Sequence, residues 1–205
     1  MARFGINPDH AMGVRVPDLR RLARELGRDH RLARDLWATG IHEARILAGM
    51  VEEPDRVTEA QMERWVRAFD SWDLCDQVCG NLFDRTPFAV QKAHQWAARD
   101  EEFVKRAAFA LMAWLAVHDR AADDGVFMDF LPLIEREAGD HRNYVRKAVN
   151  WALRQIGKRN VRLHRAAVRT AERIARHGSR AAGWVASDAL RELRGEAVVR
   201  RLRVR

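Results

Sequence analysis

Apolar residues along this chain recur every three or four positions, with charged residues filling the positions between them. That spacing matches the 3.6 residues per turn of an α-helix and gathers the apolar side chains on one face. Ala, Leu, Arg and Glu dominate and β-branched runs are absent, which also favours helix. The pattern predicts an all-α chain with helices over residues 17–29, 31–38, 41–52, 59–69, 72–84, 88–99, 101–118, 126–137, 142–158, 161–177 and 179–193.

Several residues at the ends of these segments support the assignment. Pro17 suits the first turn of a helix, where its missing N–H costs nothing. Thr58 with Gln61 forms a capping-box pattern after the helix breaker Pro54. The connections between the predicted helices are short, and none is a Pro/Gly/Ser-rich linker. We therefore expect a single domain over residues 1–205.

About ten helices joined by brief turns favour stacked antiparallel pairs over a globin-like or four-helix bundle. The repeat period is irregular, at roughly 35–45 residues, which indicates a HEAT-like α-solenoid rather than a strict repeat. Such a stack is curved, and its concave side would offer an extended surface to a duplex. The fold expected is an α-solenoid with a concave basic face.

Composition narrows the class of protein. The chain has 205 residues, of which 47% are hydrophobic and 32% charged, as in globular proteins rather than disordered ones. Its two cysteines, Cys75 and Cys79, lie one helical turn apart without a companion ligand nearby, so we expect buried thiols in a reducing compartment. No long apolar run suggests a signal peptide or membrane span. We expect a soluble, cytoplasmic, nucleoid-associated protein.

Charge is distributed unevenly along the chain. The last 65 residues hold 18 Lys or Arg and only 4 Asp or Glu, whereas the first 140 hold 19 and 25. Arginines in this part of the chain recur every three or four residues. In a helix they would form a row about 21 Å long, at ~1.5 Å per residue. Such a row is often the solvated face of a helix. However, like charges repel unless a polyanion lies opposite them. The uneven distribution of charge along the chain favours nucleic acid as that polyanion. This arginine row consists of Arg162, Arg165, Arg169, Arg173 and Arg176.

The segment 142–158 carries a tryptophan among basic residues. Trp151 shares a helix face with Lys147, Arg154 and Lys158, away from the expected core positions. An indole in a basic stripe suits contact with sugars, bases or a cationic ligand. The alternative is a tryptophan covered by a neighbouring helix with an arginine stacked over it.

A second group of residues lies in the segment SWDLCD, residues 71–76. Trp72 and Asp76 are four positions apart and share the border between core and solvent, while Asp73 faces more fully outward. An indole beside a carboxylate can enclose a cation or a sugar with developing positive charge. Taken singly, Asp73 suits a first-turn residue and Asp76 suits an ion pair with a neighbouring arginine.

Other residue types indicate structure rather than chemistry. There is no Gly-rich phosphate loop, HExxH or GxSxG motif, so we expect no metal and no cofactor. His42 and His118 suit surface or capping positions. The remaining tryptophans have core-like spacing, and we expect packing roles for Trp37, Trp65, Trp96, Trp114 and Trp184.

Five segments, in order, together resemble a known family. They are GVRVPDLRRLARELG (13–27), LW…HEARILA (36–48), SWDLCDQVCGNLF (71–83), FVKRAAFAL (103–111) and NYVRKAVNWALRQIGK (143–158). The chain resembles the DNA alkylation repair proteins of the AlkD type, which are HEAT-like-repeat DNA glycosylases. The resemblance covers about three quarters of the chain.

The resemblance implies a specific function. The chain would hydrolyse the N-glycosidic bond of cationic N3- or N7-alkylated purines in double-stranded DNA. We expect a monomer, the default for a repair solenoid, and no cofactor. The lesion would stay stacked in the duplex while Trp72, Asp76 and Trp151 surround it and Arg106 holds a backbone phosphate. Arg106 is assigned by the resemblance alone.

Two other functions are compatible with the residues. The first is a non-catalytic protein of the same architecture that binds damaged or branched DNA. The second is a protein–protein scaffold, a common role of HEAT-type stacks, in which the arginine row meets an acidic partner or RNA.

Overall fold

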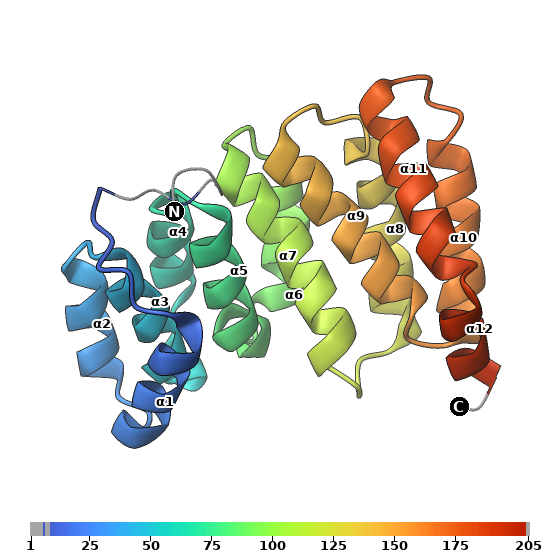
Figure 1. Ribbon diagram of the computed structural model, residues 1–205. Coiled ribbons are helices and arrows are strands. Elements are labelled where there is room, and N and C mark those ends of the chain that lie inside the picture. Colours follow the sequence, from blue (N-terminus) through green and yellow to red (C-terminus); the bar gives the residue numbers. More distant parts are fainter. Residues whose placement is uncertain (1–5, 7–8, 204–205) are drawn as a thin grey trace. The chain divides into compact units, whose positions relative to one another are not determined.

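A computed structural model describes residue 6 and residues 9–203, and the regular secondary structure in this part of the chain is entirely helical (Figure 1). It comprises twelve α-helices and two short 3₁₀ turns among the described residues. The predicted all-α fold is confirmed. The helices group into two compact units, residues 1–89 and 90–205. A single domain over residues 1–205 stays a prediction.

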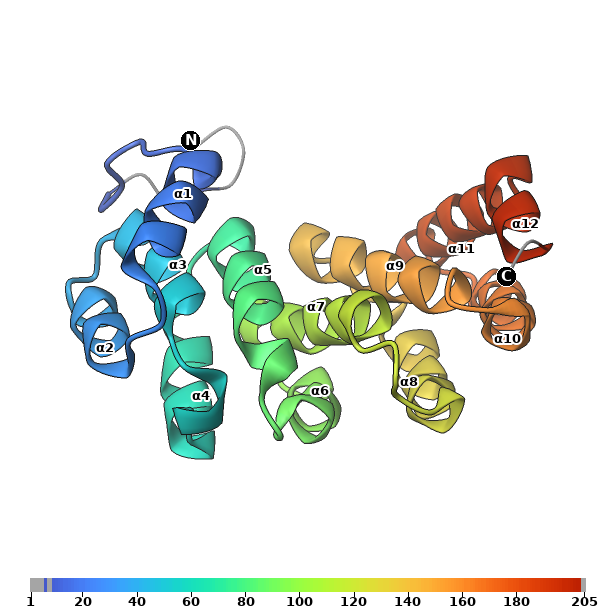
Figure 2. The ribbon, with the colours of Figure 1, turned by 90° about the horizontal axis from the view of Figure 1, so that it is seen from below.

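Unit 1 is organised around its third helix. Helix α3 packs against α1, α2 and α5, so it forms the centre of this unit (Figures 1 and 2). The bounds are α1 Val16–Leu26, α2 His30–Ala38, α3 His42–Val51, a 3₁₀ turn Pro54–Arg56, α4 Glu59–Arg67, α5 Trp72–Asn81 and a 3₁₀ turn Phe83–Arg85.

Unit 2 consists of two helical layers. Figure 2 shows α6, α8 and α10 along one side of the unit and α7, α9 and α11 along the other. Helix α9 is central, because it packs against α7, α8, α10 and α11. The bounds are α6 Ala89–Ala97, α7 Glu102–His118, α8 Asp124–Glu137, α9 Asn143–Gly157, α10 Val161–Ile174, α11 Arg180–Leu193 and α12 Glu196–Arg203.

The helix ends agree with most of the sequence signals. The Thr58 side chain accepts a hydrogen bond from the Gln61 backbone N–H at 3.2 Å, and Pro17 lies in the first turn of α1. Several bounds differ from the prediction, and the helix predicted over 17–29 ends at Leu26. The helix predicted over 72–84 ends at Asn81 and continues as a 3₁₀ turn, the helix predicted over 161–177 ends at Ile174, and helix α12 was not predicted.

Each unit has its own core. In unit 1, the indoles of Trp37 and Trp65 stack with centroids 3.9 Å apart, and Phe69 lies edge-on to Trp37. In unit 2, Trp96 is fully buried, as expected. The packing role predicted for Trp184 is wrong: this side chain is 38% exposed, and the Arg146 guanidinium lies 4.7 Å from its ring centroid. A cation over the exposed ring face replaces core burial at this position.

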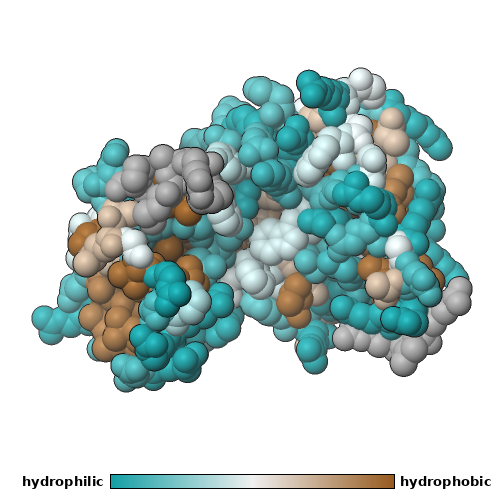
Figure 3. All heavy atoms as spheres, viewed as in Figure 1, coloured by the Kyte–Doolittle hydropathy of each residue, from teal (hydrophilic) through white to brown (hydrophobic). Residues whose placement is uncertain are grey.

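The surfaces of the two units differ in character. In the view of Figure 3, hydrophobic residues gather over the α1 region of unit 1, whereas unit 2 is mostly hydrophilic. The exposed apolar side chains at α1 and just before it are Met12, Val14, Leu22 and Leu26. No helix within the described residues is both long enough and apolar enough to cross a bilayer.

Candidate nucleic-acid interface

Helix α5 carries Trp72 and Asp76 at its border with solvent. Both side chains are half-buried and lie one turn apart on the same side of the helix. The opposite side is fixed in the core by Leu74, Cys75 and Val78, which are fully buried. The indole and the carboxylate are therefore held on a helix face whose orientation is set by core packing.

Asp73, next to Trp72, pairs with a histidine from α3. The Asp73 Oδ2 atom lies 2.9 Å from Nε2 of His42, and His42 is only 6% exposed. The outward orientation predicted for Asp73 and the surface or capping role predicted for His42 are both wrong. Their pairing follows from the packing of α3 against α5, which brings together residues 31 positions apart.

This pairing shifts the titration of both groups. Burial opposes the charged form of His42, but the hydrogen bond and charge of Asp73 outweigh it and raise the pKa of His42 above its ordinary value. Burial likewise opposes the Asp73 carboxylate, and the hydrogen bond and charge of His42 outweigh it and lower the pKa of Asp73. The two groups stabilise each other as an ion pair at the N-terminal turn of α5.

The cysteines of α5 are structural. Cys75 and Cys79 are thiols, not joined in a disulfide, and both are fully buried, as predicted. Burial raises the pKa of the Cys79 thiol, and the neighbouring Cys75 and Asp76 raise it further. A protonated, buried thiol is a poor nucleophile and a poor metal ligand. Within the described residues, no group of three His, Cys, Asp or Glu side chains is arranged to hold a metal ion.

In unit 2, Trp151 lies half-buried on α9 against an aromatic residue of α7. Its ring meets that of Trp114 edge to face, with centroids 5.3 Å apart and an interplanar angle of 84°. Trp114 in turn stacks on the exposed His118. This edge-to-face packing restrains the Trp151 ring against α7.

The basic residues around Trp151 are only partly available to a ligand. Lys147 is exposed, whereas Arg154 and Lys158 both pair with Glu192 of α11, the lysine at 2.6 Å. The ammonium and guanidinium groups outweigh the effect of burial and lower the pKa of Glu192. Glu192 therefore offsets part of the positive charge on this face of α9.

Arg106 lies on α7 and is buried, with 5% of its surface exposed. Its Nη1 group donates a hydrogen bond of 2.6 Å to the backbone carbonyl of Tyr144, in the first turn of α9. The guanidinium thus joins α7 to α9. A phosphate contact by Arg106 needs a donor other than the one directed at Tyr144, and this contact stays a prediction.

Four members of the arginine row are exposed on α10, in the layer that also contains α8, and the fifth, Arg176, follows the end of this helix. Arg173 pairs with Glu135 at 2.7 Å, and Arg162 lies 3.9 Å from Asp124, both on α8. Helix α9, which carries Trp151, belongs to the other layer of unit 2 (Figure 2). The arginine row and the basic residues around Trp151 therefore lie on different layers of unit 2. Binding of DNA by the arginine row stays a prediction.

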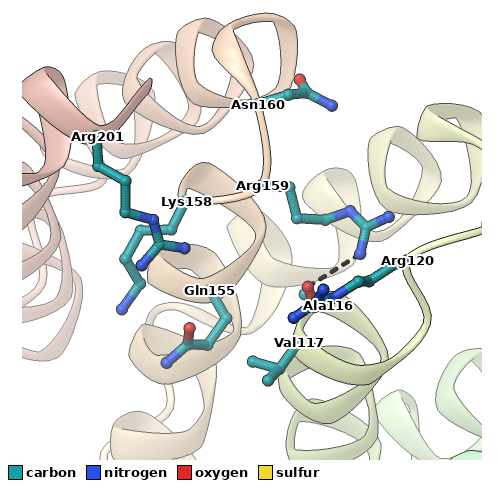
Figure 4. Close-up of a pocket in the computed structure, with 8 residues that line it drawn as sticks. All are labelled: Ala116, Val117, Arg120, Gln155, Lys158, Arg159, Asn160 and Arg201. Carbon is teal, nitrogen blue, oxygen red and sulfur yellow. Dashed lines mark hydrogen bonds between the residues drawn. The ribbon is translucent and has the colours of Figure 1, made fainter. Parts of the chain in front are cut away.

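The sequence patterns missed a cavity of ≈ 590 Å³ in unit 2 (Figure 4). Arg120, Lys158, Arg159 and Arg201 line it, together with Ala116, Val117, Gln155 and Asn160. Of these residues the sequence pattern singles out only Lys158, which shares a helix face with Trp151. The remaining cations come from the connections after α7 and α9 and from α12, none of which shows a periodic basic pattern.

Comparisons with known proteins agree with this architecture. A family model described as DNA alkylation repair enzyme matches residues 1–193. One solved structure with a similar fold is described as "A new family of proteins related to the HEAT-like repeat DNA glycosylases with affinity for branched DNA structures". It is 22% identical, has a TM-score of 0.75, and the match covers 93% of this chain and 86% of that chain. A search of the curated proteins finds no match. The structural likeness confirms the HEAT-like helical fold.

Proposed function

The chain belongs to the DNA alkylation repair enzyme family, and we propose that it is a DNA glycosylase that releases cationic N3- or N7-alkylated purines from duplex DNA. The Trp72/Asp76 pair on α5 carries this proposal. An indole and a carboxylate held one helical turn apart suit a nucleotide whose sugar becomes positively charged.

The proposed reaction begins from a base that is already a good leaving group. Alkylation at N3 or N7 gives the purine a positive charge, so the bonding electrons of C1′–N pass to the base as that bond breaks. The deoxyribose becomes oxocarbenium-like, a water oxygen bonds to C1′, and the water loses a proton to the carboxylate or to solvent. Little acid catalysis of base departure is required.

We assign the carboxylate role to Asp76. A fixed negative charge stabilises the positive charge that develops on the sugar, and the same oxygen atoms can orient the attacking water. Helix α5 suits this role because its buried side holds the carboxylate without a mobile loop. The proposal requires no metal ion or cofactor.

The other residues of the set bind the nucleotide. Trp72 and Trp151 would offer π faces to the cationic base and its sugar. Arg106 would hold a backbone phosphate through a donor not used by Tyr144. Because these contacts address sugar and backbone, the lesion need not leave the base stack.

The test is base release from a duplex containing one 7-methylguanine. We expect the Asp76→Asn variant to release base at least about a hundredfold more slowly than the parent, because it loses the charge but keeps the shape. Asp55→Asn, which removes an exposed carboxylate from the same unit, is the matched control and should act like the parent. Equal rates for Asp76→Asn and Asp55→Asn would rule out the assigned role.

A second candidate function is DNA binding without base release. It is favoured by the likeness to a protein described as having affinity for branched DNA structures. In that case the chain would bind a four-way junction at least as tightly as an alkylated duplex and leave the alkylated base in place. Base release from the duplex separates the two functions.

A further inference from the structure

The cavity in unit 2 is lined by cations on two sides. Arg120 reaches it from the connection after α7, Lys158 and Arg159 from the end of α9, and Arg201 from α12 (Figure 4). None of its lining residues in the described part of the chain is acidic. Its volume of ≈ 590 Å³ is ample for a phosphate group and the sugar attached to it.

Two of the four cations have structural roles. Arg159 donates hydrogen bonds to the carbonyls of Ala116 and Asp119 at 2.9 and 2.8 Å, and its guanidinium lies 3.9 Å from the centroid of Phe127. Lys158 is paired with Glu192 at 2.6 Å. Arg159 therefore fixes one wall of the cavity, and Lys158 adds a partly neutralised charge.

Arg120 and Arg201 lack such partners. Both are exposed, and within the described residues neither guanidinium makes a hydrogen bond or ion pair. Each brings five N–H donors in a planar arrangement that suits phosphate oxygens. Two guanidinium groups lining one cavity without a carboxylate repel each other, so the site favours an anion.

We propose that this cavity binds a backbone phosphate of the DNA strand that passes Trp151, with Arg120 and Arg201 as its ligands. This inference rests on the proposed function. Trp151 and Lys158 are seven residues apart, which is about 10 Å along the axis of α9. One DNA strand has a phosphate every ~3.4 Å along the duplex axis, so this distance spans at most about three phosphates. The phosphate is therefore within about three nucleotides of the one at Trp151.

The cavity combines residues from inside and outside the family match. The family match ends at residue 193, whereas Arg201 lies on α12, residues Glu196–Arg203. Helix α12 packs on α11 (Figure 1). Its Arg201 side chain lines the cavity (Figure 4).

The test compares two double variants that remove the same charge. In Arg120→Ala with Arg201→Ala, we expect affinity for duplex DNA to fall about tenfold, and the slope of log affinity against log salt to become about two units shallower. The control is Arg180→Ala with Arg200→Ala, two exposed arginines outside the cavity, and it should lose less than about twofold. Equal losses in both double variants would overturn the proposal.

A neutral phosphate locates the contact. Single methylphosphonates are placed at each of four positions on either side of a 7-methylguanine. At one position the methylphosphonate should weaken DNA binding by the parent protein but leave binding by the Arg120→Ala, Arg201→Ala double variant unchanged. If every methylphosphonate weakens binding by the double variant as much as it weakens binding by the parent, the cavity does not bind a phosphate. Base release can still support the proposed function in that case. If the parent fails to bind DNA at all, both proposals are wrong.

Discussion

The His42–Asp73 pair is the residue-scale feature with the clearest link to the candidate site. It joins α3 to the turn of α5 that begins with Trp72, over a distance of 2.9 Å. Because the two side chains are only 5% and 14% exposed, the loss of either charge would leave its partner without compensation. The charge state of this pair therefore affects how firmly the start of α5 is held.

This pair predicts a pH dependence of stability. The raised pKa of His42 means that its contribution is complete below its ordinary pKa of 6.5 and is lost as pH rises through the raised value. The lowered pKa of Asp73 means that its contribution is present above 3.8 and is lost as pH falls through the lowered value. From about pH 6 to about pH 8.5, the urea midpoint of the parent should fall more than that of His42→Asn. Parallel decreases would show that the pair does not control this region.

Residue spacing identified part of the candidate site. The sequence pattern singles out Trp72, Asp76 and Trp151, because each lies outside the buried apolar face of its helix. Arg106 was assigned by resemblance alone, since a buried arginine on a helix with apolar residues on every side has no periodic signal. The partner of Asp73 could not be predicted, because it comes from the packing of a different helix.

At the scale of helices, strong amphipathic periodicity made most elements predictable. Helix α12 was missed because it spans only Glu196–Arg203 and is rich in arginine. Short helices are marginal on their own, so α12 depends on packing against α11. The layer to which α10 belongs was also not predictable, since a helix's charge pattern indicates its exposed face but not its neighbours.

Helix packing at the end of α9 requires a glycine. A Cβ atom at Gly157 would lie 2.7 Å from Cδ2 of Leu193 and 2.9 Å from Cβ of Ala167. We expect Gly157→Ala to lower the free energy of unfolding by about 1–3 kcal/mol, because α10 must shift away from α9 at Ala167 and the Leu193 side chain must move. Chemical denaturation provides the measurement.

Gly183 is the matched control for this substitution. It lies inside α11, and a Cβ there would meet no atom within 4 Å. Gly183→Ala should therefore raise the stability by about 0.5–1 kcal/mol through better helix propensity. A Gly157→Ala variant as stable as Gly183→Ala would show that the contact between α9, α10 and α11 is looser than described.

At the scale of the whole molecule, the net charge of +8 is concentrated toward the C-terminus. In unit 2 this charge lies in two places. The basic residues around Trp151 and the cavity form one region, and the arginine row lies in the other layer. Ion pairs with Glu192 and Glu135 reduce part of it. The sequence predicted the excess of charge but could not predict this division or the ion pairs.

The arginine row predicts a sequence-independent effect on binding. Arg165 and Arg169 are exposed and make no ion pair among the described residues. Their joint replacement by Glu should weaken binding to every duplex alike by about tenfold or more and make the salt slope shallower. Arg31→Glu with Arg34→Glu, on α2, is the control of equal charge. Unchanged binding in the α10 variant would place the arginine row outside the interface.

The most direct measurement of the proposed function is the release of free base from a duplex with a single 7-methylguanine, compared with the same duplex carrying neutral hypoxanthine. A glycosylase that relies on a cationic leaving group is predicted to release 7-methylguanine, leave an abasic site and retain hypoxanthine. Tight binding of the alkylated duplex with the base still attached would contradict the catalytic proposal. Equal release of both bases would contradict the role assigned to the charge of the lesion.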